Sequence, residues 1–426
     1  MVKFSRTGAV LSLLGGWLAV GCATEQPMAK TAAPAETARA AAEVKPAAPA
    51  RASGGIMIPD KVLADHGFTT LWTKQPMEGS FRSVHLLPEG IFAVTGGREA
   101  RTLRLVRYSL ENGLPLWSYP LDESLDHPPV AYHYAVGGES RPPDELFILQ
   151  KDVIRCLDLQ YGAEMWRIHL PFSVSCAPVV DERNFYIGSY NRRIFAYPKN
   201  KGVELWPFVT GGEVKSAGAL GSSGQIYFTC TDKSVYRLEP INGFVRGKSW
   251  TFQTGGRVLG SPVFFSRWVY VGSTDFKLYA FEVDGTRAWD FPAEAPIVQT
   301  PVVVSFRPDK PIAFCISEDD RRGDEKRVAW AVDARTGTEL WRRIGVQQVV
   351  AIGRRAVYLI PDARAGGERR LIGVDALKGD ELSSLPLGSF DIVPTNDAVH
   401  GTNPRTRGTI FLISKSGTMQ AIREKP

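Results

Sequence analysis

The chain has 426 residues, with 51 Lys and Arg against 45 Asp and Glu and a formal net charge of +6. Basic residues come at most two in a row, so no run of positive charge indicates a nucleic-acid partner. P-loop, G-x-S-x-G and H-E-x-x-H patterns are absent from the sequence, which excludes the best-known signatures of nucleotide, acyl-transfer and zinc-protease chemistry.

The first predicted element is an export signal. MVKFSRTG carries two basic residues and no acid, and the apolar run AVLSLLGGWLAVG is too short to span a bilayer comfortably. Small residues precede Cys22, and the segment resembles a bacterial lipoprotein signal. The resemblance implies that residues 1–21 are removed and that Cys22 is lipidated. An ordinary secretory peptide is the alternative.

A tether is predicted over residues 22–55. After the cysteine the chain is rich in Ala and Pro and has almost nothing to bury, which is typical of a disordered linker. Ala23 and Thr24 follow Cys22, where an acidic residue would favour the inner membrane in many Gram-negative lipoproteins. By that resemblance, the lipid anchor lies in the outer membrane and the remaining chain faces the periplasm.

Residues 56–426 contain a repeated phrase in which Trp follows Gly. The phrases end 39 to 52 residues apart, and the spacing from Gly to Trp is four residues in five of them. This period is typical of a four-stranded β-propeller blade. The glycine is expected in the turn before the outer strand, and the tryptophan is expected to cover the gap between blades. The structural repeat signature is Gly67, Trp72, Gly113, Trp117, Gly162, Trp166, Gly202, Trp206, Gly243, Trp250, Gly285, Trp289, Gly337 and Trp341.

Short β-rich runs precede the phrases, and eight candidate third strands can be counted, the last ending near Ile422. The sequence therefore predicts an all-β, eight-bladed propeller of four-stranded antiparallel blades. DHGFTTLW has no three strands before it, and the chain ends after a third strand. We expect the N-terminal strand to pair into the last blade and so close the ring. Ser383 stands where the seventh repeat should have its Trp, so that blade is expected to be less regular.

The cysteines and histidines give little indication of a catalytic or metal site. Apart from Cys22, four cysteines lie in hydrophobic strand phrases, and none forms a C-x-x-C pair; they are Cys156, Cys176, Cys230 and Cys315. We expect four free thiols, and a disulfide between Cys156 and Cys176 is the alternative.

His127 and His133 are the closest approach to a metal-ligand pair, but no third ligand accompanies them. No catalytic residue, cofactor or metal site is predicted.

The repeats resemble the quinoprotein-type propeller repeat, as WAVDARTGTELW and CLDLQYGAEMW show, from residue 66 to the C-terminus. Two families compete. The pyrroloquinoline quinone dehydrogenases use a disulfide of adjacent cysteines, a calcium ion and a catalytic Asp. This chain has no Cys-Cys pair and no haem-binding C-x-x-C-H.

The second family is that of the BamB-like outer-membrane lipoproteins, which combine a lipidated cysteine, a tether and an eight-bladed propeller. That resemblance implies a non-enzymatic partner of the machinery that inserts β-barrels into the outer membrane. The family's contact loop carries Leu and Arg, whereas RIHLPFSVSCAPVV has no such Leu-x-x-Arg, so no contact residue is transferred.

A binding scaffold also follows from the fold class, because a propeller exposes many loops on two faces. The longest insertions, RPPDEL, SEDDRRGDEK and DARAGGERR, are candidate interaction surfaces. Their alternative role is that of tolerated surface loops. The main rival function is that of an envelope propeller that binds a small ligand or polysaccharide. A quinone-dependent dehydrogenase is the further alternative.

Overall fold

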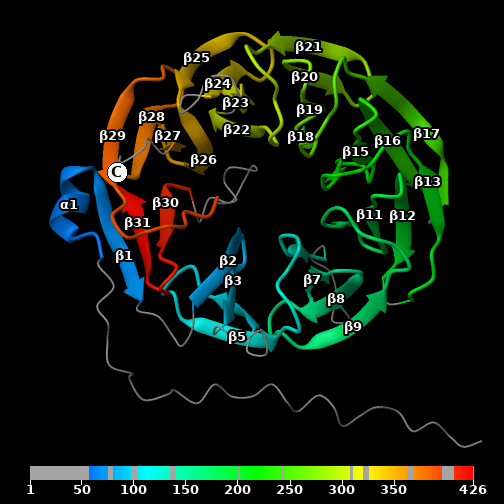
Figure 1. The fold of residues 1–426 in the computed structure, drawn as a ribbon, viewed down its shortest axis with the longest axis horizontal. Coiled ribbons are helices and arrows are strands. Elements are labelled where there is room, and N and C mark those ends of the chain that lie inside the picture. Colours follow the sequence, from blue (N-terminus) through cyan, green and yellow to red (C-terminus); the bar gives the residue numbers. More distant parts are fainter. Residues whose placement is uncertain are drawn as a thin grey trace, which may run out of the picture. The chain divides into compact units, whose positions relative to one another are not determined.

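The structure is a computed structural model, and it describes residues 57–74, 80–96, 103–134, 141–199, 201–241, 244–307, 310–319, 326–362, 368–395 and 407–425. Strands dominate these residues, which form eight antiparallel sheets arranged in a ring (Figure 1). The predicted all-β, eight-bladed propeller is confirmed. Within the described ranges, no helix is long and apolar enough to cross a membrane.

Seven sheets have four strands in sequence order, from an inner strand near the ring axis to an outer strand on the rim. Blades 1 to 4 are β2 (Ser80–Leu87), β3 (Gly90–Gly96), β4 (Arg104–Tyr108) and β5 (Pro115–Pro120); β6 (Val130–Tyr132), β7 (Glu145–Gln150), β8 (Val153–Asp158) and β9 (Glu164–His169); β10 (Val179–Val180), β11 (Asn184–Gly188), β12 (Arg193–Pro198) and β13 (Trp206–Val209); and β14 (Ala219–Leu220), β15 (Ile226–Thr229), β16 (Ser234–Ile241) and β17 (Phe244–Gln253). Blades 5 to 7 are β18 (Val263–Phe265), β19 (Trp268–Ser273), β20 (Lys277–Glu282) and β21 (Arg287–Pro292); β22 (Val302–Arg307), β23 (Lys310–Glu318), β24 (Arg327–Asp333) and β25 (Glu339–Ile344); and β26 (Val346–Ile352), β27 (Ala356–Pro361), β28 (Arg370–Asp375) and β29 (Glu381–Pro386).

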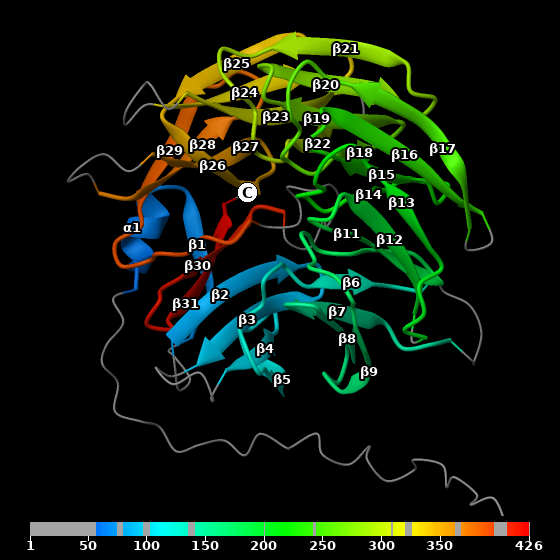
Figure 2. The same cartoon turned by 45° about the vertical axis from the view of Figure 1, so that its right-hand side comes forward.

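Blade 8 closes the ring from both ends of the domain. After the short helix α1 (Asp60–Asp65), β1 (Phe68–Lys74) pairs antiparallel with β31 (Met419–Glu424), which pairs with β30 (Thr409–Ile413) (Figures 1 and 2). This confirms the predicted closure. The sheet has three strands rather than four, because only an isolated bridge between Ile392 and Ile413 stands in the place of its inner strand.

Tryptophans on the outer strands pack against the next blade and donate hydrogen bonds to it. Trp341 of blade 6 donates from Nε1 to the carbonyl of Ala376 in blade 7 over 2.9 Å. Its ring covers Gly379, whose φ is +81° and whose added Cβ would lie 2.7 Å from Trp341 Cγ. Only a residue without Cβ tolerates this turn under this ring. The same pair of contacts joins Trp72 to Leu110 and Gly113, Trp117 to Leu159 and Gly162, Trp250 to Val283 and Gly285, and Trp289 to Ala334 and Gly337.

Two other joints differ. Trp166 stacks on Phe185 of blade 3, with ring centroids 6.2 Å apart, and the nearest atoms to an added Cβ at Gly202 belong to Ile168. The indole Nε1 of Trp206 is buried and has no hydrogen-bond partner among the described residues. Gly243, the turn glycine that follows Trp206 in the repeat, lies outside the described residues.

The joint between blades 7 and 8 uses different chemistry. Ser383 on β29 occupies the tryptophan position, and Gly67, at φ +82°, has no atom within 4 Å of an added Cβ. At this joint, instead of a tryptophan–glycine contact, Tyr358 of β27 packs on Phe68 of β1, with ring centroids 5.5 Å apart. Burial, together with the Glu424 carboxylate, raises the pKa of Tyr358. Blade 7 is a complete sheet, with two register shifts between β26 and β27.

Candidate functional site

The propeller has two faces that differ in their connections. At one face, called the pocket face here, second strands turn into third strands and each outer strand leads to the next blade; at the other, the turn face, lie the glycine turns before the outer strands. SEDDRRGDEK joins β23 to β24 and DARAGGERR joins β27 to β28, so both insertions belong to the pocket face of adjacent blades. Residues 320–325 and 363–367 of these insertions lie outside the described residues. RPPDEL belongs to the turn face of blade 2, and its last two residues begin β7.

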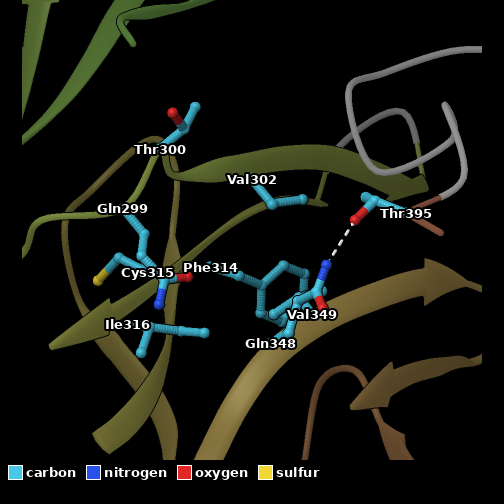
Figure 3. Close-up of a pocket in the computed structure, with 9 residues that line it drawn as sticks. All are labelled: Gln299, Thr300, Val302, Phe314, Cys315, Ile316, Gln348, Val349 and Thr395. Atoms are coloured by element: carbon cyan, nitrogen blue, oxygen red, sulfur yellow. Dashed lines mark hydrogen bonds between the residues drawn. The ribbon is translucent and has the colours of Figure 1, made fainter. Parts of the chain in front are cut away.

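A pocket of about 180 Å³ lies between blades 6 and 7 (Figure 3). Gln299 and Thr300, before β22, border one side of it, while Gln348 on β26 and Thr395 border the other. The remaining lining residues, on β22, β23 and β26, are buried and form an apolar floor: Val302, Phe314, Cys315, Ile316 and Val349. Val302, Phe314, Ile316 and Val349 belong to the core that packs blade 6 on blade 7, whereas Cys315 belongs to the core between blades 5 and 6.

The polar groups of the pocket are partly engaged with one another. Gln348 Nε2 donates to Thr395 Oγ1 over 2.9 Å, and the backbone N–H of Ser261 donates to Thr300 Oγ1 over 2.9 Å. The Gln299 amide has no partner among the described residues. The described lining residues thus offer neutral donors and acceptors, and none of them carries a charge.

A charged cluster on the same face joins blades 6 and 7. Arg327, the first residue of β24, contacts Glu318 of its own blade at 2.9 Å and Asp362 of blade 7 at 2.8 Å. Burial opposes the charge of Arg327, but the two carboxylates hold its pKa above the ordinary value. Asp362 Oδ2 is buried without a partner among the described residues. The cluster holds the described ends of the two pocket-face insertions, SEDDRRGDEK and DARAGGERR, against each other.

On the turn face, His133 bridges blades 1 and 2. Its Nε2 lies 2.5 Å from Glu89 Oε1 and its Nδ1 lies 2.9 Å from Asp144 Oδ2. Burial favours neutral His133, but the two carboxylate hydrogen bonds outweigh burial and raise its pKa. His127 is not part of this arrangement. Across the described ranges, no group of three or more His, Cys, Asp or Glu side chains could hold a metal ion.

The four cysteines of the propeller, Cys156, Cys176, Cys230 and Cys315, are free and buried. The Cys156–Cys176 disulfide is therefore not formed in this structure. Burial raises the pKa of Cys230 to about 11 and that of Cys176 to about 12. A thiol is a poor nucleophile when its pKa is so high, so these cysteines act as small core residues. Cys22 lies outside the described residues.

The quinone cofactor of the dehydrogenases does not fit this pocket. Its calcium ion requires oxygen ligands that include carboxylates, and none of the nine lining residues carries a charge. The volume is also below the roughly 300–1,000 Å³ typical of sites for larger organic ligands. Cys315, the cysteine among the lining residues, has no adjacent cysteine to form the family's vicinal disulfide.

Ring closure, four-stranded blades and interblade tryptophans define a β-propeller of the quinoprotein repeat type. The sequence matches the family described as "Outer membrane protein assembly factor BamB" over residues 150–261 and 245–425, well over half of the chain. The chain therefore belongs to the BamB family. No curated protein matches it.

Solved structures share the fold at low sequence identity. BamB from Moraxella catarrhalis is 16% identical, with a TM-score of 0.58, covering 84% of this chain and 97% of that one. The quinohemoprotein alcohol dehydrogenase ADHIIG from Pseudomonas putida HK5 is 9% identical, with a TM-score of 0.57, covering 85% and 77%. The computationally designed Ika8 protein is 11% identical, with a TM-score of 0.56, covering 83% and 99%. These neighbours include both an assembly factor and an enzyme, so the likeness establishes the fold alone.

The interblade hydrogen bonds of Trp72, Trp117, Trp250, Trp289 and Trp341 follow the repeated phrase, whereas no sequence motif indicated the pocket. The residues Gln299, Gln348 and Thr395 come from three separate segments, and no motif or spacing links them. The cluster of Arg327 with Glu318 and Asp362 could be predicted only in part from the sequence, through the charged insertions that flank it.

Proposed function

We propose that this protein is a non-enzymatic, lipid-anchored propeller scaffold that binds envelope proteins and acts, like BamB, in the assembly of outer-membrane β-barrels. Residues 1–21 are the signal peptide, Cys22 carries the lipid, and residues 22–55 tether the propeller on the periplasmic side of the outer membrane. The BamB family match over most of the propeller carries this proposal.

The pocket face supports a binding function. Two insertions begin and end there on blades 6 and 7, and Arg327 holds their described ends together through Glu318 and Asp362. Rigid scaffolds commonly carry recognition residues in loops of this kind. A pocket lined by uncharged side chains on the same face adds a specific feature that a partner could recognise.

Membrane attachment is tested by Cys22→Ser. The wild-type protein should fractionate with the outer membrane and carry a lipid detectable by mass spectrometry. The variant should be released into the soluble periplasmic fraction, because one cysteine supplies the whole anchor. Outer-membrane fractionation of the variant would contradict the lipid anchor.

Partner binding is tested by a photo-crosslinking amino acid at Lys415 or at Lys378. Both lysines are exposed on neighbouring blades, but Lys415 lies on the pocket face and Lys378 lies on the turn face. We expect Lys415 to capture components of the barrel-insertion machinery and Lys378 to serve as the matched control. If those components are recovered from neither position, the BamB-like role fails.

The enzyme alternative has its own test. Purified protein is mixed with pyrroloquinoline quinone and Ca²⁺, and dye-linked alcohol oxidation is measured. We expect no turnover above a protein-free control. Turnover that depends on both the quinone and the protein would contradict the scaffold function.

A further inference from the structure

The pocket between blades 6 and 7 has hydrogen-bonding groups at two ends and an apolar floor between them. Gln299 and Thr300 lie on one side, Gln348 and Thr395 lie on the other, and Val302 and Phe314 lie between them (Figure 3). A charged ligand would lose water here and gain no opposite charge from the described lining residues. The lining therefore suits an uncharged ligand with an apolar centre and polar groups at both ends.

The dimensions restrict that ligand further. A volume of about 180 Å³ is too small for a whole drug-sized molecule, but it can take one amino-acid side chain with the peptide groups beside it. Three of the polar lining residues, Gln299, Thr300 and Thr395, precede or follow strands at the pocket face, so the pocket opens there. A longer chain can therefore continue beyond the pocket.

The free hydrogen-bonding capacity matches peptide groups. Because Gln348 Nε2 is bound to Thr395, the Gln348 side chain presents its carbonyl oxygen as an acceptor. The Gln299 amide offers both a donor and an acceptor. A peptide group carries one strong donor and one strong acceptor, and a buried one must find partners for both. Two amides on opposite sides of an apolar floor meet that requirement for an extended segment.

We propose that this pocket binds an extended, uncharged segment of a partner protein, with one apolar side chain on the Val302–Phe314 floor and its peptide groups on Gln299 and Gln348. The inference rests on the proposed function as a protein-binding scaffold, and it specifies the chemistry of the segment that the scaffold recognises.

The test uses two capped tripeptides, acetyl-Ala-Val-Ala-amide and acetyl-Ala-Asp-Ala-amide, with the full chain in detergent. Binding is measured by saturation-transfer NMR and titration. We expect the Val peptide to bind at least tenfold more tightly than the Asp peptide, because none of the nine described lining residues supplies a counter-charge. Gln299→Ala and Gln348→Ala should each weaken the Val peptide about fivefold, the loss of one neutral hydrogen bond. Equal binding of both peptides would overturn the proposal.

Leu116→Ala, on the outer strand of blade 1, is the matched surface control, because Leu116 is exposed and blade 1 is not adjacent to blade 6 or blade 7. It should leave peptide binding unchanged. If Gln348→Ala shifts the unfolding midpoint, Gln299→Ala decides the test, since its amide has no partner among the described residues to lose.

Three further outcomes distinguish a failure of this inference from a failure of the proposed function. If Lys415 captures the barrel-insertion machinery but neither glutamine variant alters peptide binding, the pocket assignment is wrong and the scaffold function stands. If glucose binds with the same dependence on Gln299 and Gln348 and displaces the Val peptide, the pocket is a sugar site and the proposal is overturned. Peptide binding by the pocket without capture of the machinery from either Lys415 or Lys378 would leave the pocket chemistry intact and refute the BamB-like role.

Discussion

The Lys199 ammonium of blade 3 donates a hydrogen bond to the Glu145 carboxylate of blade 2 over 2.6 Å, and both side chains are buried. The ammonium also lies 3.7 Å from the centre of the Tyr132 ring and 4.8 Å from that of Tyr134. Burial lowers the pKa of Lys199, against the opposing effect of Glu145. One ion pair inside an aromatic enclosure thus joins two blades.

We predict that Glu145→Gln destabilises the propeller by about 3–5 kcal/mol, because it leaves a buried ammonium without its counter-charge. The double variant Glu145→Leu with Lys199→Met should recover most of the loss, since it removes both charges. Urea unfolding followed by tryptophan fluorescence measures the difference. A double variant as unstable as the single one would show that the charge itself is not the cause.

The turn glycines offer a second comparison. Gly379 and Gly67 have nearly the same φ, +81° and +82°, but only Gly379 lies under a tryptophan. Gly67→Ala should cost about 1–2 kcal/mol, the strain of a left-handed conformation with a Cβ. Gly379→Ala should cost about 1–3 kcal/mol more, because its Cβ also displaces Trp341.

Chemical denaturation of these two alanine variants checks the difference. Equal losses would mean that the tryptophan moves aside without cost. A larger loss at Gly67 would contradict the open space found beside it.

The blade count could be predicted because the interblade contact repeats in sequence. Trp341 pairs across its sheet with Ala331, Trp289 with Ala280 and Trp206 with Ala196, so a large and a small residue recur at fixed places in several repeats. Lys199 and Glu145, by contrast, are 54 residues apart and belong to no repeated motif. The ring brings such residues together through tertiary packing, which leaves no local pattern in the sequence.

Ser383→Trp tests the joint that departs from the repeat. In seven other blades the tryptophan packs on an aromatic residue of the second strand, as Trp341 does on Phe314 with centroids 5.9 Å apart; the remaining pairs are Trp72–Phe411, Trp117–Phe92, Trp166–Phe147, Trp206–Tyr186, Trp250–Tyr227 and Trp289–Tyr270. Blade 7 retains such an aromatic residue in Tyr358.

A tryptophan at position 383 can therefore pack on Tyr358 and cover Gly67. We expect a stability gain of about 0.5–2 kcal/mol, as for other substitutions that fill open space. Thermal unfolding of the variant measures it, with Ser384→Trp on the same strand as the control. A lower midpoint for Ser383→Trp would show that Tyr358 already fills the tryptophan position.

The contact of His133 with Glu89 and Asp144 predicts a pH-dependent joint between blades 1 and 2. The folded pKa of His133 is raised, so its protonated form stabilises the fold below the unfolded value of 6.5, and this contribution is lost as the pH rises through the folded pKa. The pKa of Asp144 is lowered from 3.8 despite burial, mainly through its hydrogen bonds to His133 and Arg141. Its contribution is present above pH 3.8 and is lost as the pH falls through the folded pKa.

His133→Gln should therefore lower the unfolding midpoint more at pH 5.5 than at pH 8.5, because only the lower pH keeps the imidazole charged between its two carboxylates. Thermal unfolding at both pH values measures the effect. His169→Gln is the control, since His169 is exposed on β9 and has no carboxylate pair of this kind. Equal shifts of the His133→Gln midpoint at the two pH values would mean that neutral His133 holds the blades together as well as the charged form does.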